Sequence, residues 1–185
     1  MIRAISILIV LMSCSAAKAE DGNFYLMAEL GRGAVEFTDD YLIEEFDGDE
    51  DFSSTNVVAG YNLDSNVLFT VNFNPAKGDK FSSLDDRYEF YQLGIAVGYK
   101  IELSDRFSLT PSLGYARWEV DAREGQFLNP GPEESVEKQG GDVFGRLEVG
   151  FRLNGLLGFN WSYVTADYDF GKIQSHHFGV KFTIF

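Results

Sequence analysis

The chain has 185 residues and a net charge of −14, from 29 acidic residues against 15 basic ones. Hydrophobic residues make up 45% and aromatic residues 15%, so this is not a disordered acidic chain, and its length fits one domain or at most two small ones. The single cysteine excludes a disulfide scaffold and a cysteine-based zinc site, and the acidic balance argues against a nucleic-acid binder.

Residues 1–19 have the features of a secretory signal peptide. Arg3 gives a basic start, residues 4–12 form an uncharged apolar run, and Ala17 and Ala19 supply the small side chains that a signal peptidase reads. We therefore expect cleavage after Ala19, which leaves residues 20–185 as one barrel domain without a thiol. The alternative is a bacterial lipobox around Cys14, in which that cysteine carries a lipid.

The mature chain alternates between bulky apolar and small or polar residues with period two, which is typical of β-strands. Residues 91–101 show this most clearly, because every odd position is large and apolar and every even position is small or polar. No apolar run approaches twenty residues, which excludes a transmembrane helix. We expect eight strands, at residues 23–35, 52–63, 66–74, 88–101, 106–120, 142–153, 156–168 and 173–185.

The connections between these strands alternate between long and short for six of the seven. The short ones contain turn residues, most clearly Asn154-Gly155, the strongest two-residue hairpin signal. A meander with short turns at one end and long loops at the other has this alternation of connection lengths. An antiparallel meander of eight strands can close into a barrel whose interior is just filled by side chains.

Residue size decides which face of this barrel points outward. The polar face is rich in Gly, Ala, Ser, Thr and Asn, whereas the apolar face is uniformly bulky and would not fit inside. The bulky face therefore points outward, and only lipid tolerates it. The sequence predicts an all-β fold, an eight-stranded antiparallel up-and-down transmembrane β-barrel with a small and polar lumen. A secreted lipocalin-like barrel is the alternative.

On these residues the chain resembles the small outer-membrane β-barrel family of the OmpA/OmpX type. The resemblance rests on residues 25–31 (Tyr-Leu-Met-Ala-Glu-Leu-Gly), on residues 109–115 and on the aromatic C-terminus, and it covers residues 22–185. It implies a monomer in the bacterial outer membrane, in contact with outer-membrane lipid, with short periplasmic turns and long extracellular loops. It also implies that the barrel-assembly machinery recognises the C-terminal strand, which ends at Phe185.

The C-terminus departs from the family pattern in one respect. The terminal aromatic residue of such barrels is usually in phase with the lipid-facing residues, but here Ile184, not Phe185, is in phase with Phe182. We expect either a bulge near the end of the last strand or a terminal Phe185 that lies off the pattern.

Charged residues on the face expected to line the lumen are the first candidate site. A charge inside a narrow barrel must be paired to offset its desolvation, so we interpret them as an ion-pair cluster that fills the lumen. A narrow or gated ion path is the alternative. The six residues are Glu29, Lys100, Arg146, Glu148, Arg152 and Lys181.

Residues 36–51 contain nine acids and no base, which is typical of a solvated extracellular loop. Asp47, Asp49 and Asp51 have the spacing that begins an EF-hand loop. Phe52 and Val58 stand where such a loop needs glycine and an acid, so an EF-hand is rejected. Weak surface binding of Ca²⁺ or Mg²⁺ by the three aspartates is the alternative, and no cofactor is expected.

Ser175 and His177 share one face of the last strand, and Asp167 could approach from the strand before it. A hydroxyl, an imidazole and a carboxylate form a hydrolytic triad when they line up in that order. The surrounding sequence does not match the lipid A deacylase pattern, so we expect no enzyme. The expected function is structural or one of surface interaction, by adhesion or ligand binding, with an unknown extracellular ligand. A lipid A-modifying enzyme and a narrow small-solute channel are the alternatives.

Overall fold

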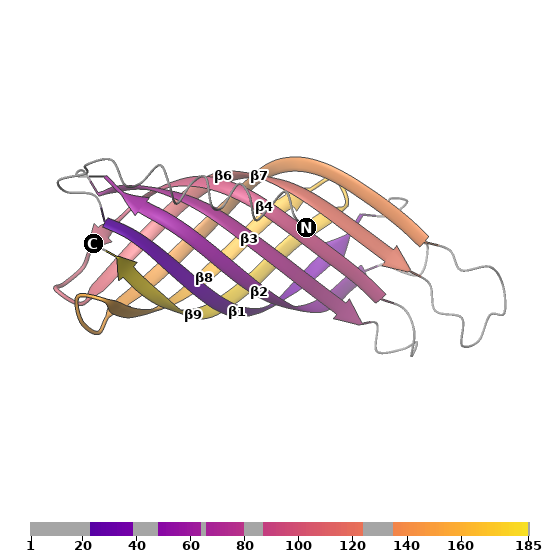
Figure 1. The fold of residues 1–185 in the computed structure, drawn as a ribbon. Coiled ribbons are helices and arrows are strands. Elements are labelled where there is room, and N and C mark those ends of the chain that lie inside the picture. The colour runs from indigo at the N-terminus through magenta and orange to yellow at the C-terminus, as the bar shows by residue number, and fades with distance from the viewer. Residues whose placement is uncertain (1–22, 39–47, 64–65, 80–86, 124–134, 185) are drawn as a thin grey trace.

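The computed structural model describes residues 23–38, 48–63, 66–79, 87–123 and 135–184, and in these the chain is all β (Figure 1). The described residues contain no helix that could span a membrane. The strands are β1 (Asn23–Phe37), β2 (Gly48–Asn62), β3 (Val67–Asp79), β4 (Arg87–Tyr99), β5 (Ile101–Glu102), β6 (Phe107–Arg123), β7 (Ser135–Arg152), β8 (Leu157–Tyr168) and β9 (Gly171–Ile184).

These strands close into one antiparallel barrel, because β1 pairs with β9 and β4 pairs with β6. The two-residue β5 continues β4 beyond a break at Lys100, since both pair with β6 in one register. The wall therefore has eight strand positions, each joined to the next by a hairpin. This confirms the prediction of an eight-stranded antiparallel up-and-down barrel.

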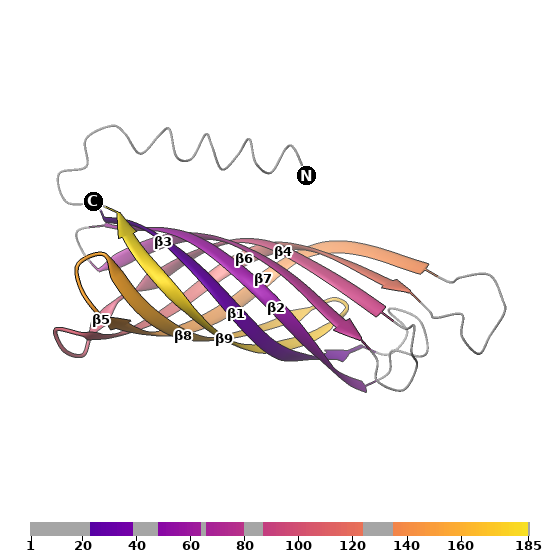
Figure 2. The ribbon, with the colours of Figure 1, turned by 60° about the horizontal axis from the view of Figure 1, so that its bottom comes forward.

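The strands are staggered around the barrel, and this stagger tilts them against its axis (Figure 2). A path that steps from partner to partner once around the wall returns to β1 at Ala34 instead of at Phe24. The path runs through Phe24, Tyr61, Phe69, Val97, Leu113, Gly145, Thr165, Gln174 and Ala34.

Bulky apolar side chains lie on the outside of the wall, as the alternation predicts. Ile95 is 63% exposed, Leu113 68% and Phe178 62%, whereas their neighbours along each strand point inward. A soluble barrel would expose this continuous belt to water, which disfavours the lipocalin-like alternative.

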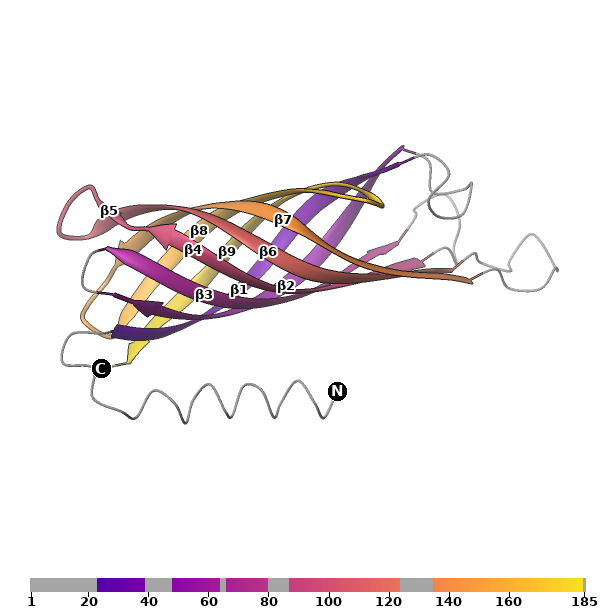
Figure 3. The ribbon, with the colours of Figure 1, turned by 90° about the horizontal axis from the view of Figure 1, so that it is seen from above.

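The hairpins at the long-loop end extend further than the sequence predicts (Figure 3). β7 begins at Ser135 rather than 142, and β2 begins at Gly48 rather than 52, so the acidic segment 36–51 is partly strand. These extensions are held by backbone pairing, Arg123 with Ser135 and Phe37 with Gly48. Backbone pairing needs no apolar side chain, and therefore the apolar alternation stops before the strand does.

Aromatic side chains fill the loop half of the lumen, which corrects the expectation of a uniformly small and polar interior. They fit because each of several rings lies over a glycine on the neighbouring strand. A Cβ atom at Gly78 would overlap the Tyr88 ring, and one at Gly140 would overlap the Trp118 ring. The buried rings of this aromatic plug are Phe37, Phe52, Tyr88, Phe90, Trp118, Phe144, Tyr168 and Phe170.

The connection between β8 and β9 is a tight turn that also contributes to this plug. Phe170 lies in the turn, is 1% exposed and packs against Trp118 with ring centroids 4.7 Å apart. The next residue, Gly171, has φ of 155°, and a Cβ atom there would overlap the Glu36 carbonyl. Glycine at 171 therefore lets the chain reverse while Phe170 points inward.

The last strand keeps one register against β1 from Gly171 to Ile184. Ile184 is 47% exposed on the outer face, in phase with Phe182 at 51%. No bulge interrupts β9 in its described length, and Phe185 lies outside the described residues.

Candidate functional site

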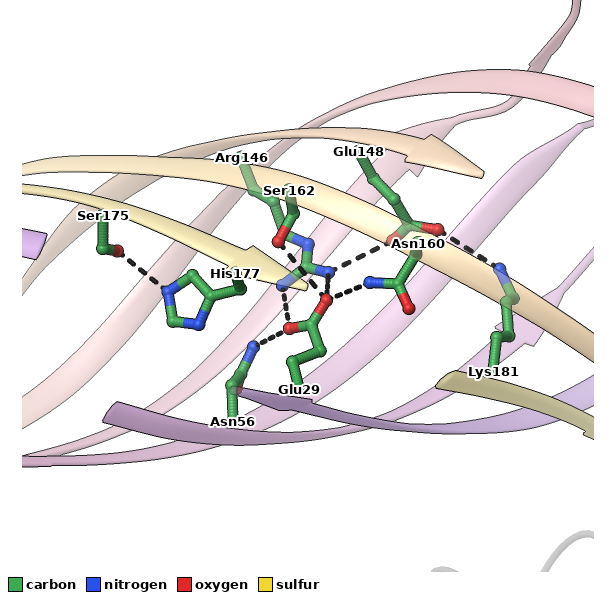
Figure 4. A network of polar contacts seen from close by, with 9 residues as sticks. All are labelled: Glu29, Asn56, Arg146, Glu148, Asn160, Ser162, Ser175, His177 and Lys181. Carbon is green, nitrogen blue, oxygen red and sulfur yellow. Dashed lines mark hydrogen bonds and ion pairs between the residues drawn. The ribbon is translucent and has the colours of Figure 1, made fainter. Parts of the chain in front are cut away.

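Glu29 and Arg146 form an ion pair across the lumen (Figure 4). Both point inward, Glu29 from β1 and Arg146 from β7. The guanidinium donates two hydrogen bonds to the carboxylate, from Nη1 to Oε2 at 3.0 Å and from Nη2 to Oε1 at 2.7 Å. Glu29 is 3% exposed, so this bidentate pair is shielded from water.

Three neutral side chains complete the coordination of the Glu29 carboxylate. Asn56 donates to Oε2 at 2.5 Å, Ser162 donates to Oε1 at 3.3 Å, and Asn160 also donates to Oε1. They come from β2 and β8, so four elements of the wall meet at one carboxylate. Gly179 on β9 makes this reach feasible, because a Cβ atom there would overlap the Glu29 side chain.

Glu148 and Lys181 extend the pair into a balanced cluster of four charges. Arg146 Nη2 also donates to Glu148 Oε2 at 3.2 Å, and Lys181 Nζ donates to Glu148 Oε1 at 3.4 Å. Lys181 lies over the Tyr25 ring, 3.8 Å from its centroid. We call Glu29, Arg146, Glu148 and Lys181 the lumen cluster; its two carboxylates and two cations cancel.

The structure places the other two charges proposed for the lumen elsewhere. Lys100 and Arg152 keep the inward parity of their strands, but the wall ends there and both reach the short-turn mouth of the barrel. Lys100 Nζ donates to Glu102 Oε1 at 2.9 Å, and this contact holds the pKa of the exposed Glu102 carboxyl below its usual range. Arg152 donates to the backbone carbonyl of Asp105 in the neighbouring turn, 3.1 Å from its Nε.

Ser175 and His177 are in hydrogen-bond contact, with Ser175 Oγ 2.9 Å from His177 Nε2. Each is 1% exposed and faces the lumen. Asp167 lies on the outer face of β8, so the structure does not bring it to the imidazole. The pair thus has neither the orienting carboxylate of a triad nor access to lipid.

The proposed cation site lies mostly outside the described part of the chain. Asp47 is not among the described residues, Asp49 is described only as part of the β2 backbone, and Asp51 is exposed on β2. Within the described ranges, no group of three or more His, Cys, Asp or Glu side chains could hold a metal ion.

The aromatic plug is the part of the interior that sequence reasoning missed. Its rings continue the inward phase of their strands: Phe90 and Trp118, for example, are in phase with the lumen residues Gln92 and Ala116. Extending the inward phase of each strand toward the loops would have found them. Beside the plug rings lies a small apolar cavity of about 10 Å³, room for about one water molecule. It is lined by Val35, Phe52, Ala76, Tyr88, Phe90, Val120, Phe170 and Ile173.

A closed eight-position barrel with a bulky apolar exterior and a paired, filled lumen matches one family model. The outer membrane protein beta-barrel domain model matches residues 4–184. The chain belongs to this family. No curated protein sequence matches the chain.

Solved outer-membrane barrels share the architecture at low sequence identity. Neisserial surface protein A superposes with a TM-score of 0.67 at 12% identity, covering 89% of this chain and 100% of that chain. Ail, the attachment invasion locus protein of Yersinia pestis, gives 0.62 at 13%, covering 89% and 99%. The N-terminal barrel domain of Pseudomonas aeruginosa OprF gives 0.52 at 11%, covering 89% and 100%. The similarity to these three is one of fold.

Proposed function

We propose that the protein is an integral barrel of the bacterial outer membrane that binds a partner at its long-loop end, outside the cell. The observation that carries this proposal is the filled lumen. The lumen cluster bridges the barrel, and the aromatic plug fills the half nearest the loops. A barrel without a continuous water path is suited to be a scaffold, which leaves the hairpins beyond the membrane as the surface that interacts.

The charge of the loop end favours a basic partner. Nine acids and no base lie in residues 36–51, and residues 117–142, which form the β6–β7 hairpin, add seven acids against three bases. One structural neighbour, Ail, has been solved with the heparin analogue sucrose octasulfate, which is a polyanion. The acidic loops of this chain would repel such a ligand, so we do not extend that ligand to it.

Binding by cells that display the protein tests the proposal. The native chain is compared with a variant in which Asp39, Asp40, Glu44 and Glu45 are replaced by their amides, against a panel of purified basic secreted proteins. The native chain should bind a member of the panel, the amide variant should not, and binding should weaken as salt rises.

The matched control replaces Glu102 and Asp105 at the short-turn end by their amides. This variant should bind like the native chain, because the short turns face the other side of the membrane. Equal loss in the control and the loop variant would contradict binding at the loop end.

We propose that the chain has no catalytic role, in contrast to the alternative of a lipid A-modifying enzyme. The Ser175–His177 pair is the only hydroxyl–imidazole contact among the described residues, and it faces the lumen, where an outer-leaflet lipid does not reach. Lipid A from a deletion strain and lipid A from the same strain complemented with the gene should therefore give identical mass spectra. A mass difference of one acyl chain would refute this.

A further inference from the structure

Arg32 and His176 form an exposed basic pair on the outer wall of the barrel. They lie on neighbouring strands, β1 and β9, as direct cross-strand partners. The preceding outward pair toward the short-turn end is Leu30 with Phe178, 71% and 62% exposed. The two side chains therefore lie at the border of the apolar belt that is nearer the loops, at the level where the lipid headgroups begin.

Two aromatic rings hold the His176 imidazole in place. Trp161 stacks on it with centroids 5.6 Å apart and planes at 21°, and Tyr163 lies at 5.1 Å and 40°. Tyr163 is the strand partner of His176 on β8, so the three strands β8, β9 and β1 present one surface. A ring held in this way has a fixed position on β9, directly across from Arg32 on β1.

Within the described residues, no carboxylate forms an ion pair with Arg32 or His176. Arg32 faces Ser53 on its other side, and the next acid toward the loops, Asp51, pairs with Ala34. Two other outward bases have acidic partners: Lys77 forms an ion pair with Glu89, and Lys172 has Glu36 and Asp167 as strand partners. The positive charge of Arg32 is thus left for a group that is not part of the wall.

We propose that Arg32 and His176 bind the phosphate of an anionic outer-leaflet glycolipid such as lipid A. Phosphate suits a guanidinium, which can donate two parallel hydrogen bonds to it. The acyl chains of the same lipid would lie on Leu30, Phe178 and Trp161. A soluble anion would gain the charge contact but not this apolar contact. The inference rests on the outer-membrane setting proposed above and is independent of the partner at the loops.

Tryptophan fluorescence can test the site directly. The chain has two tryptophans, of which Trp118 is buried in the plug and Trp161 is 39% exposed beside His176. In a Trp118→Phe background, the emission therefore reports on the site. Detergent-folded protein is titrated with lipid A that carries its phosphates, with dephosphorylated lipid A and with inorganic phosphate.

We expect saturable binding of phosphorylated lipid A and at least about tenfold weaker binding of the dephosphorylated lipid. Arg32→Gln should weaken binding of the phosphorylated lipid to the same degree. The control is Arg117→Gln, which removes the first outward base above the apolar belt on β6, where Arg117 Nη2 already donates to Gln139 Oε1 at 3.0 Å. This control should bind like the parent.

Equal binding of the two lipids, or an equal loss in the Arg117 control, would overturn the proposal. Saturation by inorganic phosphate at the same concentration as by lipid would assign the pair to soluble anions instead. A heat-dependent gel shift, recorded for every variant, separates these outcomes from failure to form the barrel. Unchanged binding of loop partners by Arg32→Gln would keep the proposed function standing even if the lipid site fails.

Discussion

Glu29 is the residue whose surroundings are most fully specified in the lumen. Its carboxylate accepts hydrogen bonds from Arg146, Asn56, Asn160 and Ser162. A buried pair of this kind adds little net stability compared with apolar residues of similar size, but removing one partner leaves a desolvated charge. The lumen cluster therefore avoids destabilising the barrel only when every buried charge keeps its partner.

Replacing Arg146 alone should destabilise the barrel strongly. Arg146→Met leaves the Glu29 carboxylate buried without its cation, at a cost of about 3–5 kcal/mol of unfolding free energy. The double variant Glu29→Leu/Arg146→Met should recover much of this loss. Urea unfolding in lipid vesicles measures both. Arg152→Met at the exposed mouth is the control and should change the unfolding free energy by about 1 kcal/mol or less. Additive losses in the double variant would contradict the argument.

A second prediction concerns the glycines that lie under the aromatic plug. Gly140→Ala should destabilise the barrel by about 1–3 kcal/mol, because the new methyl group overlaps the Trp118 ring. Gly145→Ala is the matched control on the same strand, since its Cβ atom would be 3.7 Å from Thr165, an ordinary contact. Unfolding midpoints and Trp118 emission measure the effect, and equal midpoints for both variants would count against the packing of the plug.

At the scale of strands, the outward apolar face and the backbone pairing of a strand end at different residues. The outward apolar positions of β4 continue from Tyr91 to Tyr99, and this range defines the belt in contact with lipid. The backbone pairing of β6 and β7 continues beyond the belt, to Arg123 and Ser135. The first determines insertion into a membrane, and the second determines how far the hairpin projects.

The lipid-facing side of β4 should not tolerate a charge. Ile95→Arg places a guanidinium among Val71 and Tyr115, its strand partners, in the middle of the belt. We expect a loss of about 2–4 kcal/mol, seen as a smaller fraction of heat-shifted folded protein after refolding into vesicles. Glu119→Arg, outward on β6 but beyond the belt, should fold normally. If Ile95→Arg folds as well as this control, the belt does not face lipid.

The β6–β7 hairpin should be separable from the barrel. Arg123 and Ser135 are strand partners, so residues 124–134 can be replaced by Asn-Gly, which favours a two-residue hairpin turn. The shortened chain should keep its gel shift, because both strands keep all of their pairing. Any binding that depends on this loop should be lost. A missing folded band would mean that residues 124–134 help to hold the barrel together.

At the scale of the whole molecule, the lumen consists of two layers with different chemistry. The lumen cluster fills the half nearer the short turns, and the aromatic plug fills the half nearer the loops. Each layer blocks water by a different means, ion pairing in one and close packing in the other. Opening a path would require both to be disrupted.

Reconstituted protein should therefore show no stable conductance steps in planar bilayers. An open sixteen-stranded porin in the same bilayers serves as the positive control. The variant Glu29→Leu/Arg146→Met, which removes the ion pair of the lumen cluster, should also show no conductance steps, since the aromatic plug remains. Stepwise conductance of the native chain would favour the narrow-channel alternative over a scaffold.

The class of fold and the side of the wall that each strand residue occupies follow from the amino-acid sequence alone. Period-two alternation is a local property, so residues 91–101 predict their own inward and outward faces without any partner strand. The bulk of the outward face and the small residues of the inward face then predict a barrel that is turned toward lipid. The charge of Glu29, Arg146, Glu148 and Lys181 likewise predicts that they need partners.

The partners of these residues, in contrast, follow only from the closed barrel. Glu29 and Arg146 are 117 positions apart, and their contact depends on the stagger around the closed wall, which no single strand encodes. The same stagger sets Trp118 over Gly140 and brings Arg32 opposite His176. Alternation fixes a face but not a height along the barrel axis, so it could not separate Lys100 and Arg152 at the mouth from the charges in the lumen. Height is set by register, and register arises only when all strands pair.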